Sequence, residues 1–169
     1  MESAAPARQT GAIDKEVTMQ RLEWSPLLET GVAEMDASHR ALLQAIHATI
    51  DADDTSLPGR IAALLAALAA DFAEEEAMMD QLHYPAAHEH RAAHRRLLAA
   101  LQHALPVAQV DPDGARTLLE RLPRWFLGHL SAMDLPLAVA YERTARPYAP
   151  PPGAQLRIEL ARLLQEQTI

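Results

Sequence analysis

The sequence predicts an all-α protein, an antiparallel up-down-up-down four-helix bundle followed by a short extra C-terminal helix. Alanine and leucine, both strong helix formers, dominate a chain in which aromatic residues make up 4% and glycines number 6. No run of Val, Ile, Thr and Tyr alternates with polar residues, as a half-buried strand would. Four helical segments of roughly 16 to 25 residues are joined by short connectors, which favours neighbours that run in opposite directions.

The first two helices are marked by residues typical of helix starts. Asp36 is a good N-cap, and the first helix is expected to run from it to about Asp51. The second helix follows the segment TSLPG, in which Pro58 suits a first turn, and continues to about Leu82.

Prolines delimit the other two helices. The third begins after Pro85 and ends near Leu105, ahead of a further proline. The fourth begins at Asp111, bends at Pro123 and stops at the residue before Pro136. A proline inside a helix lacks the N–H group and clashes with the preceding turn, which is why it is expected to bend or end the helix.

The bundle is expected to occupy residues 21–145, after a loose N-terminal tail of small and polar residues at 1–20. Residues 146–169 are expected to form a Pro-rich linker and a short amphipathic helix. The apolar positions of that helix lie within 154–166, where they could contact a partner protein or mediate self-association.

Composition excludes several classes of function. The formal net charge of −8 gives no electrostatic support to nucleic-acid binding. The chain has no cysteine, which excludes disulfides and cysteine-ligated zinc or iron–sulfur sites. No stretch of about 18 apolar residues is present, so no membrane span is expected. The N-terminal segment lacks the apolar core of a signal peptide, and the expected location is the cytoplasm.

Every predicted helix contributes imidazole or carboxylate side chains to one group of candidate metal ligands. In chain order these residues are His39, Asp71, Glu75, His90, His94, His129 and Asp134. Asp71 and Glu75, like His90 and His94, are four residues apart, so each pair lies about 40° apart on one helix face. Side chains that converge in a bundle core in this way are how di-metal carboxylate sites are built.

The chemistry of these side chains favours a transition-metal site. Neutral imidazole together with carboxylate suits iron, manganese or zinc, whereas sites made of oxygen alone suit magnesium or calcium. Seven ligands are too many for one tetrahedral zinc ion, but they suit two metal ions bridged by Glu75 and Asp134. Without a metal, a buried cluster of four histidines and three carboxylates would be costly.

The remaining acidic and histidine residues have simpler interpretations. An acidic stretch such as DFAEEE is most often a solvated face, and this is what we expect of Glu74, Glu76 and Asp80. The histidines that fall outside the helical register of the site, expected at the surface or behind the ligands, are His47, His83, His88 and His103.

Three stretches of the chain resemble the hemerythrin family, and the bacterial hemerythrins in particular. They are LEWSPLLETGVAEMDASHRALL, DFAEEEAMMDQLHYPAAHEHRAAH and WFLGHLSAMD, which fall within about residues 22–140. The spacing is specific, with HxxxH fifteen residues after a glutamate and HxxxxD on the last helix.

The resemblance implies a di-iron site that binds O2 at one of its two irons. Glu75 and Asp134 would bridge the two ions, and His39 would bind the iron that keeps an open position for O2. The residues that would complete the other, six-coordinate iron are His90, His94 and His129.

The sequence departs from the family at Asp71. The family's motif begins with histidine, as HFxxE, where this chain reads DFAEE. A carboxylate therefore replaces the second imidazole of the O2-binding iron. Because aspartate is shorter, it ligates directly only if its helix shifts inward, and otherwise it holds a ligating water. Its charge makes the diferrous pair less positive, which favours the ferric state, and a hard oxygen donor also eases the entry of manganese.

Three classes of function remain open. The first is an oxygen-binding protein that carries, stores or senses O2, with fast autoxidation caused by Asp71. The second is a di-iron redox enzyme that acts on O2, peroxide or NO. The third is an interaction module that holds one metal ion or none. The absence of an obvious general acid–base group beyond the ligands favours the first class over the second.

Overall fold

The computed structural model describes residues 21–145, and every regular element within that range is helical. In chain order the elements are η1 (Pro26–Leu28), α1 (Ala33–Ile50), α2 (Leu57–Leu82), α3 (Ala87–Val107), α4 (Pro112–Leu119), α5 (Leu122–His129), the π-helical segment η2 (Leu130–Asp134) and α6 (Leu135–Ala145). The predicted all-α bundle is confirmed. The expected N-terminal tail, Pro-rich linker and C-terminal amphipathic helix lie outside the described residues.

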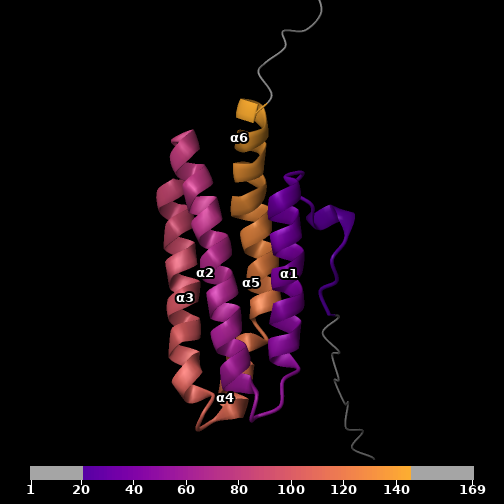
Figure 1. Cartoon of the computed structure of the whole chain (residues 1–169), viewed down its shortest axis with the longest axis vertical. Coiled ribbons are helices and arrows are strands. Elements are labelled where there is room, and N and C mark those ends of the chain that lie inside the picture. Colours follow the sequence, from indigo (N-terminus) through magenta and orange to yellow (C-terminus); the bar gives the residue numbers. More distant parts are fainter. Residues whose placement is uncertain (1–20, 146–169) are drawn as a thin grey trace, which may run out of the picture.

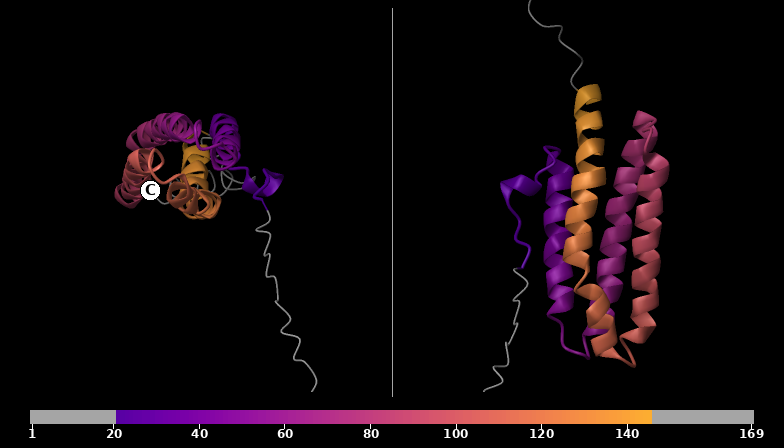
Figure 2. Two further views of the ribbon diagram at one scale, coloured as in Figure 1. Left: turned by 90° about the horizontal axis from the view of Figure 1, so that it is seen from below. Right: turned by 180° about the vertical axis from the view of Figure 1, so that it is seen from behind.

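Four rods make up the bundle. Figure 1 shows α1, α2, α3 and a composite rod of α5, η2 and α6 side by side, with the short α4 across one end. The views of Figure 2 show the same rods from below and from behind. Helix α2 packs on both α1 and α3, and the composite rod closes the bundle by packing on α1 and α2. Within residues 21–145 no helix is long and apolar enough to cross a membrane.

Helix α1 begins before Asp36, so the prediction that Asp36 is its N-cap is wrong. The N-cap position is Val32, whose carbonyl oxygen accepts the N–H of Asp36 at 2.9 Å. The Asp36 carboxylate instead turns back to the preceding loop, where it accepts the N–H groups of Thr30 at 2.6 Å and Gly31 at 3.2 Å. Gly31 has a φ of 89°, a conformation that glycine adopts without strain. A carboxylate in the first turn therefore fixes the loop that leads into the helix.

The segment predicted as one helix bent at Pro123 is divided into α4, α5, η2 and α6. Helix α4 ends at Leu119, and Pro123 lies in the first turn of the separate helix α5 rather than at a bend. Pro136 does not stop the chain's helical course, because the π-helical segment η2 precedes it and α6 follows. In a π-turn the N–H group bonds to a carbonyl five residues earlier, as Leu135 does to Leu130. This wider turn accommodates a proline that a regular helix would not.

The buried apolar side chains form two clusters with the polar residues between them. The larger cluster fills the half of the bundle near α4 and includes Ile46, Leu64 and Leu101. The smaller cluster contains Met35, Met79 and other residues at the opposite end. On α1 and α2 the candidate ligands follow one cluster and precede the other in the sequence. Apolar packing on both sides therefore holds a polar layer inside the core.

Candidate metal centre

The structure brings all seven predicted site residues into one buried layer. Their relative exposure runs from 0% at His94 to 8% at His129. They come from α1, α2, α3 and the composite rod: His39, Asp71, Glu75, His90, His94, His129 and Asp134. Because buried charged groups are costly unless they are paired or bind a metal, this layer needs an explanation beyond packing.

The π-helical segment explains why His129 and Asp134 share the site. In a regular α-helix residues five apart point in directions about 140° apart, and only one of the two could face the core. The π-turn between them brings both to the same side. Their Nε2 and Oδ1 atoms lie 3.2 Å apart.

Three histidines form one side of the centre. The Nε2 atom of His129 lies 3.1 Å from those of His90 and His94. Glu75 Oε2 lies 3.2 Å from the His90 Nε2 atom and 3.1 Å from that of His94. Asp134 Oδ1 lies 3.1 Å from His90 Nε2. Neighbouring donors of an octahedral ion with bonds of about 2.1–2.2 Å are about 3.0–3.1 Å apart, so these separations fit one such ion.

The carboxylate atoms on this side are not paired in the ordinary way. Glu75 Oε2 and Asp134 Oδ1 are buried and have no hydrogen-bond partner of good geometry among the described residues, although imidazole nitrogens lie near them. Their lone pairs therefore do not point along an N–H bond. A shared cation at the centre of the donor atoms would satisfy them, and the donor set fits a metal such as iron.

His39 faces the opposite side of the same two carboxylates. Its Nε2 atom lies 3.2 Å from Glu75 Oε1 and 3.5 Å from Asp134 Oδ2. Glu75 and Asp134 thus each present one oxygen atom to His39 and the other to the three-histidine side. This division of oxygen atoms is what a pair of carboxylates between two metal ions requires.

Asp71 lies further from the centre than the other candidate ligands. Its Oδ2 atom is 4.0 Å from His39 Nε2, while its Oδ1 atom accepts a hydrogen bond from Ser38 Oγ at 2.5 Å. Burial, reinforced by the charge of nearby Glu75, raises the pKa of Asp71 to about 6. The Asp71 carboxylate is thus held by α1 through one oxygen and turned toward His39 with the other.

Glu75, Asp134 and His90 favour their charged forms in the absence of metal. Burial alone would raise the pKa of Glu75, but its contacts with the imidazoles of His39, His90 and His94 outweigh burial and hold it well below the usual value. Burial would lower the pKa of His90, yet its contacts with Asp134 and Glu75 raise it to about 9. Metal binding would therefore release the proton that His90 carries in the absence of metal.

Comparison with known proteins identifies the family. The family model described as "Hemerythrin HHE cation binding domain" matches residues 30–138. The chain belongs to the hemerythrin family. A protein named "Bacteriohemerythrin" from Ralstonia nicotianae (strain ATCC BAA-1114 / GMI1000) is 35% identical over 118 residues, which cover 69% of this chain and 85% of that protein. Membership of the hemerythrins implies a binuclear iron centre, and the clusters of buried histidines and carboxylates could bind its metal.

Aromatic side chains surround the imidazoles of this hemerythrin. Phe72 stacks on His94 with ring centroids 3.7 Å apart and planes 2° apart. Trp125 stacks on His129 at 4.6 Å and 14°. Phe126 lies edge-on to His39 at 5.7 Å. These contacts fix the planes of the imidazole rings.

Glu76 contacts a histidine of the site. The prediction that it belongs to a solvated acidic face therefore needs correction. Glu76 Oε1 lies 3.2 Å from the Nδ1 atom of His94, the nitrogen that faces away from the centre. Arg91 holds Glu76 in place, with its Nε atom 3.4 Å from Glu76 Oε2, and also pairs with Asp80 at 2.7 Å. A carboxylate behind a ligating histidine fixes its tautomer and orientation. The only signal of this contact in the sequence is that Glu76 directly follows Glu75.

The four histidines outside the predicted register lie away from the donor cluster. Three of them are exposed: His83, His88 and His103. His47 is buried on α1, nearer the α4 end, and burial together with the charge of Arg21 lowers its pKa.

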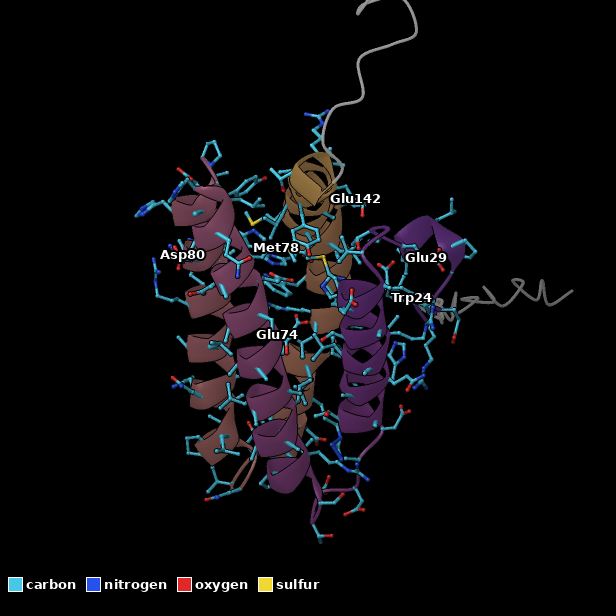
Figure 3. All side chains as sticks on the ribbon, turned by 45° about the horizontal axis from the view of Figure 1, so that its top comes forward. Trp24, Glu29, Glu74, Met78, Asp80 and Glu142 are labelled. Atoms are coloured by element: carbon cyan, nitrogen blue, oxygen red, sulfur yellow. The ribbon has the colours of Figure 1, made fainter. Side chains whose placement is uncertain are left out.

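A cavity of about 140 Å³ opens beside the His39 side of the centre. Asp71 and Glu75 form part of its wall, together with Met35 of α1 and Tyr141 of α6. Glu74 and Met78, labelled in Figure 3, line it from α2. The cavity exceeds the space that one water molecule needs, so a small molecule such as O2 can reach the Asp71 carboxylate.

Proposed function

We propose that this hemerythrin is a non-haem di-iron protein that binds O2 for carriage, storage or sensing. In this proposal Glu75 and Asp134 bridge the two irons, and His39 serves the iron next to the cavity, with Asp71 as its further carboxylate. The histidines that would complete the first iron are His90, His94 and His129. When bound, the iron pair supplies the electrons and the open coordination position that O2 binding requires.

The observation that carries the proposal is the division of the carboxylate oxygens. Glu75 directs one oxygen toward His90 and His94, and Asp134 directs one toward His90 and His129. Each directs its other oxygen toward His39. A single metal ion would use only one of these two sets. Two sets, with unequal numbers of imidazoles, support two ions with different coordination.

The negative charge of Asp71 is expected to make the diferrous pair easy to oxidise. Two ferrous ions with two bridging carboxylates have a formal charge of about +2, and ionised Asp71 lowers it to about +1. Less positive charge favours the ferric state, so the oxygenated protein is expected to autoxidise quickly. The same hard oxygen donor supports manganese as an alternative metal.

The structure also favours a second candidate, a di-iron redox enzyme that acts on O2, peroxide or NO. The specific observation is the cavity at Asp71, which places a carboxylate where a small reactant would bind. A carboxylate in that position can hold a proton or a water molecule for a reacting ligand.

Metal analysis and optical spectra of protein purified without oxygen test the proposal. We expect about two irons per chain and a visible spectrum that appears on exposure to air and is reversed, at least in part, by removal of O2. Protein without iron, or a spectrum that does not respond to O2, would contradict the proposed function. Sustained consumption of O2 or peroxide with an added reductant would favour the enzyme.

A further inference from the structure

A groove of about 480 Å³ lies beside His129 and shares no lining residue with the cavity at Asp71. Its wall carries three arginines, Arg96 from α3 and Arg121 and Arg124 from the start of α5. All three are exposed, and no ion pair joins any of them to an acidic residue within residues 21–145. The groove thus concentrates positive charge on a chain whose formal net charge is −8.

His129 connects this groove with the metal centre. It lines the groove with 8% of its surface exposed, while its Nε2 atom lies 3.1 Å from those of His90 and His94. Trp125, which also lines the groove, stacks on the His129 ring. One imidazole ring therefore separates a molecule in the groove from the donor atoms of the centre.

Small residues keep the groove open. A Cβ atom added at Gly128 would meet no atom within 4 Å outside its own helix turn. Ala93 and Ala132 line the groove as well. With no long side chain at these positions, the surface of a second protein can approach the edge of His129.

We propose that this groove docks an acidic protein that carries one electron and returns the oxidised iron pair to its ferrous state. The proposal rests on the di-iron function above, in which Asp71 favours oxidation. In each encounter the partner loses one electron and one ferric ion becomes ferrous, while no covalent bond forms or breaks. Two encounters restore the diferrous pair.

Charge complementarity selects the class of partner. Carboxylates on the partner would face Arg96, Arg121 and Arg124, which steers the encounter and fixes its orientation. A nucleic acid would meet the same arginines, but it carries no one-electron redox group and could not return the iron pair to its ferrous state. Because the groove and the Asp71 cavity lie between different helices, electrons and O2 would enter by separate routes.

The test uses the full-length iron-loaded protein after oxidation in air, with reduced plant-type ferredoxin as an acidic one-electron donor. Stopped-flow absorption gives the rate of reduction, and calorimetry gives the Kd for oxidised ferredoxin, each at low and high ionic strength. The triple variant Arg96→Glu, Arg121→Glu, Arg124→Glu should slow reduction and weaken binding by about tenfold or more at low ionic strength. Gly128→Trp should slow reduction by filling the groove without any change of charge.

Matched controls separate docking from other effects. The variant Arg60→Glu, Arg95→Glu, Arg143→Glu changes the net charge equally at exposed residues outside the groove, and it should slow reduction by less than about threefold. Reduced methyl viologen, a small cationic donor, should reduce every variant at least as fast as the native protein.

Several outcomes would overturn the docking proposal. They are reduction of the groove variant by ferredoxin at the native rate, equal slowing by both triple variants, and slowing with methyl viologen as well. Groove arginines that bind inorganic phosphate but not ferredoxin would identify a small-anion site instead. Iron content is measured first, because a chain without iron refutes the proposed function, whereas an iron-loaded chain that does not bind ferredoxin refutes the docking alone.

Discussion

The two sides of the centre differ in how completely the protein surrounds the space for a metal ion. On one side, three imidazoles and two carboxylate oxygens lie at 3.1–3.2 Å from their neighbours, and Phe72 and Trp125 stack on the rings. On the other side, His39 meets the carboxylates at 3.2 and 3.5 Å, Asp71 lies 4.0 Å away, and a cavity opens. In the proposed di-iron protein, the first side would retain the metal and the second side would react.

The largest expected effect is the loss of a ligand on the three-histidine side. His94→Ala should remove most of the bound iron and lower the Tm of the iron-loaded protein by about 10 °C or more, because the energy of metal binding is also folding energy. Iron analysis and calorimetry measure the two effects. The exposed His88, on the same helix, provides the control, and His88→Ala should change neither. Iron loss without a fall in Tm would show that the site does not stabilise the core.

Glu76→Gln should give the next largest effect, since Glu76 lies behind His94 on the same side. Gln keeps the shape of the side chain but removes the charge that orients the imidazole. We expect iron affinity to fall by about 10- to 100-fold, measured by competition with a chelator. Glu74→Gln is the matched control, because Glu74 lines the cavity and makes no such contact with His94. Equal affinity in both variants would mean that His94 does not depend on Glu76.

Asp71→His tests the reactive side. Imidazole removes one negative charge and restores the residue type found in the family's motif, so the oxygenated form should persist about tenfold longer in air. Asp71→Asn separates the causes, because it removes the charge without adding an imidazole. The lifetime is read from the decay of the visible spectrum. Equal lifetimes in the native protein and Asp71→His would contradict a decisive role for Asp71.

Ser38→Ala should give the smallest effect and in the opposite direction. The Ser38 hydroxyl donates a hydrogen bond to Asp71, which draws negative charge away from the carboxylate. Loss of a bond worth about 1 kcal/mol should shorten the oxygenated lifetime by about two- to fivefold. Ser38→Thr retains the hydroxyl and should restore the native lifetime. A longer lifetime in Ser38→Ala would show that Asp71 does not act through its charge.

The sequence predicted the helices best where prolines fix their starts. Helices α2 and α3 begin beside Pro58 and Pro85, as expected. Asp36 misled the prediction because the same carboxylate that caps a helix can also lie in its first turn and bind the preceding loop. Pro136 misled it because a π-turn has no simple sequence signal.

The sequence predicted which residues lie at the site, but it did not predict how their side chains are arranged there. The i,i+4 spacing indicated the faces of α2 and α3, but only the π-turn explains why His129 and Asp134 point the same way. Glu76 could not be separated from Glu74 by sequence, because its role depends on His94 and Arg91 of another helix. The distance of Asp71 from His39 likewise depends on how α1 and α2 pack.

The Mössbauer spectrum of diferrous protein loaded with iron-57 tests the central claim most directly. The unequal sides of the centre predict two irons per chain and two quadrupole doublets of equal area with different splittings, one for each coordination environment. One iron per chain, or two irons with a single doublet, would contradict the account.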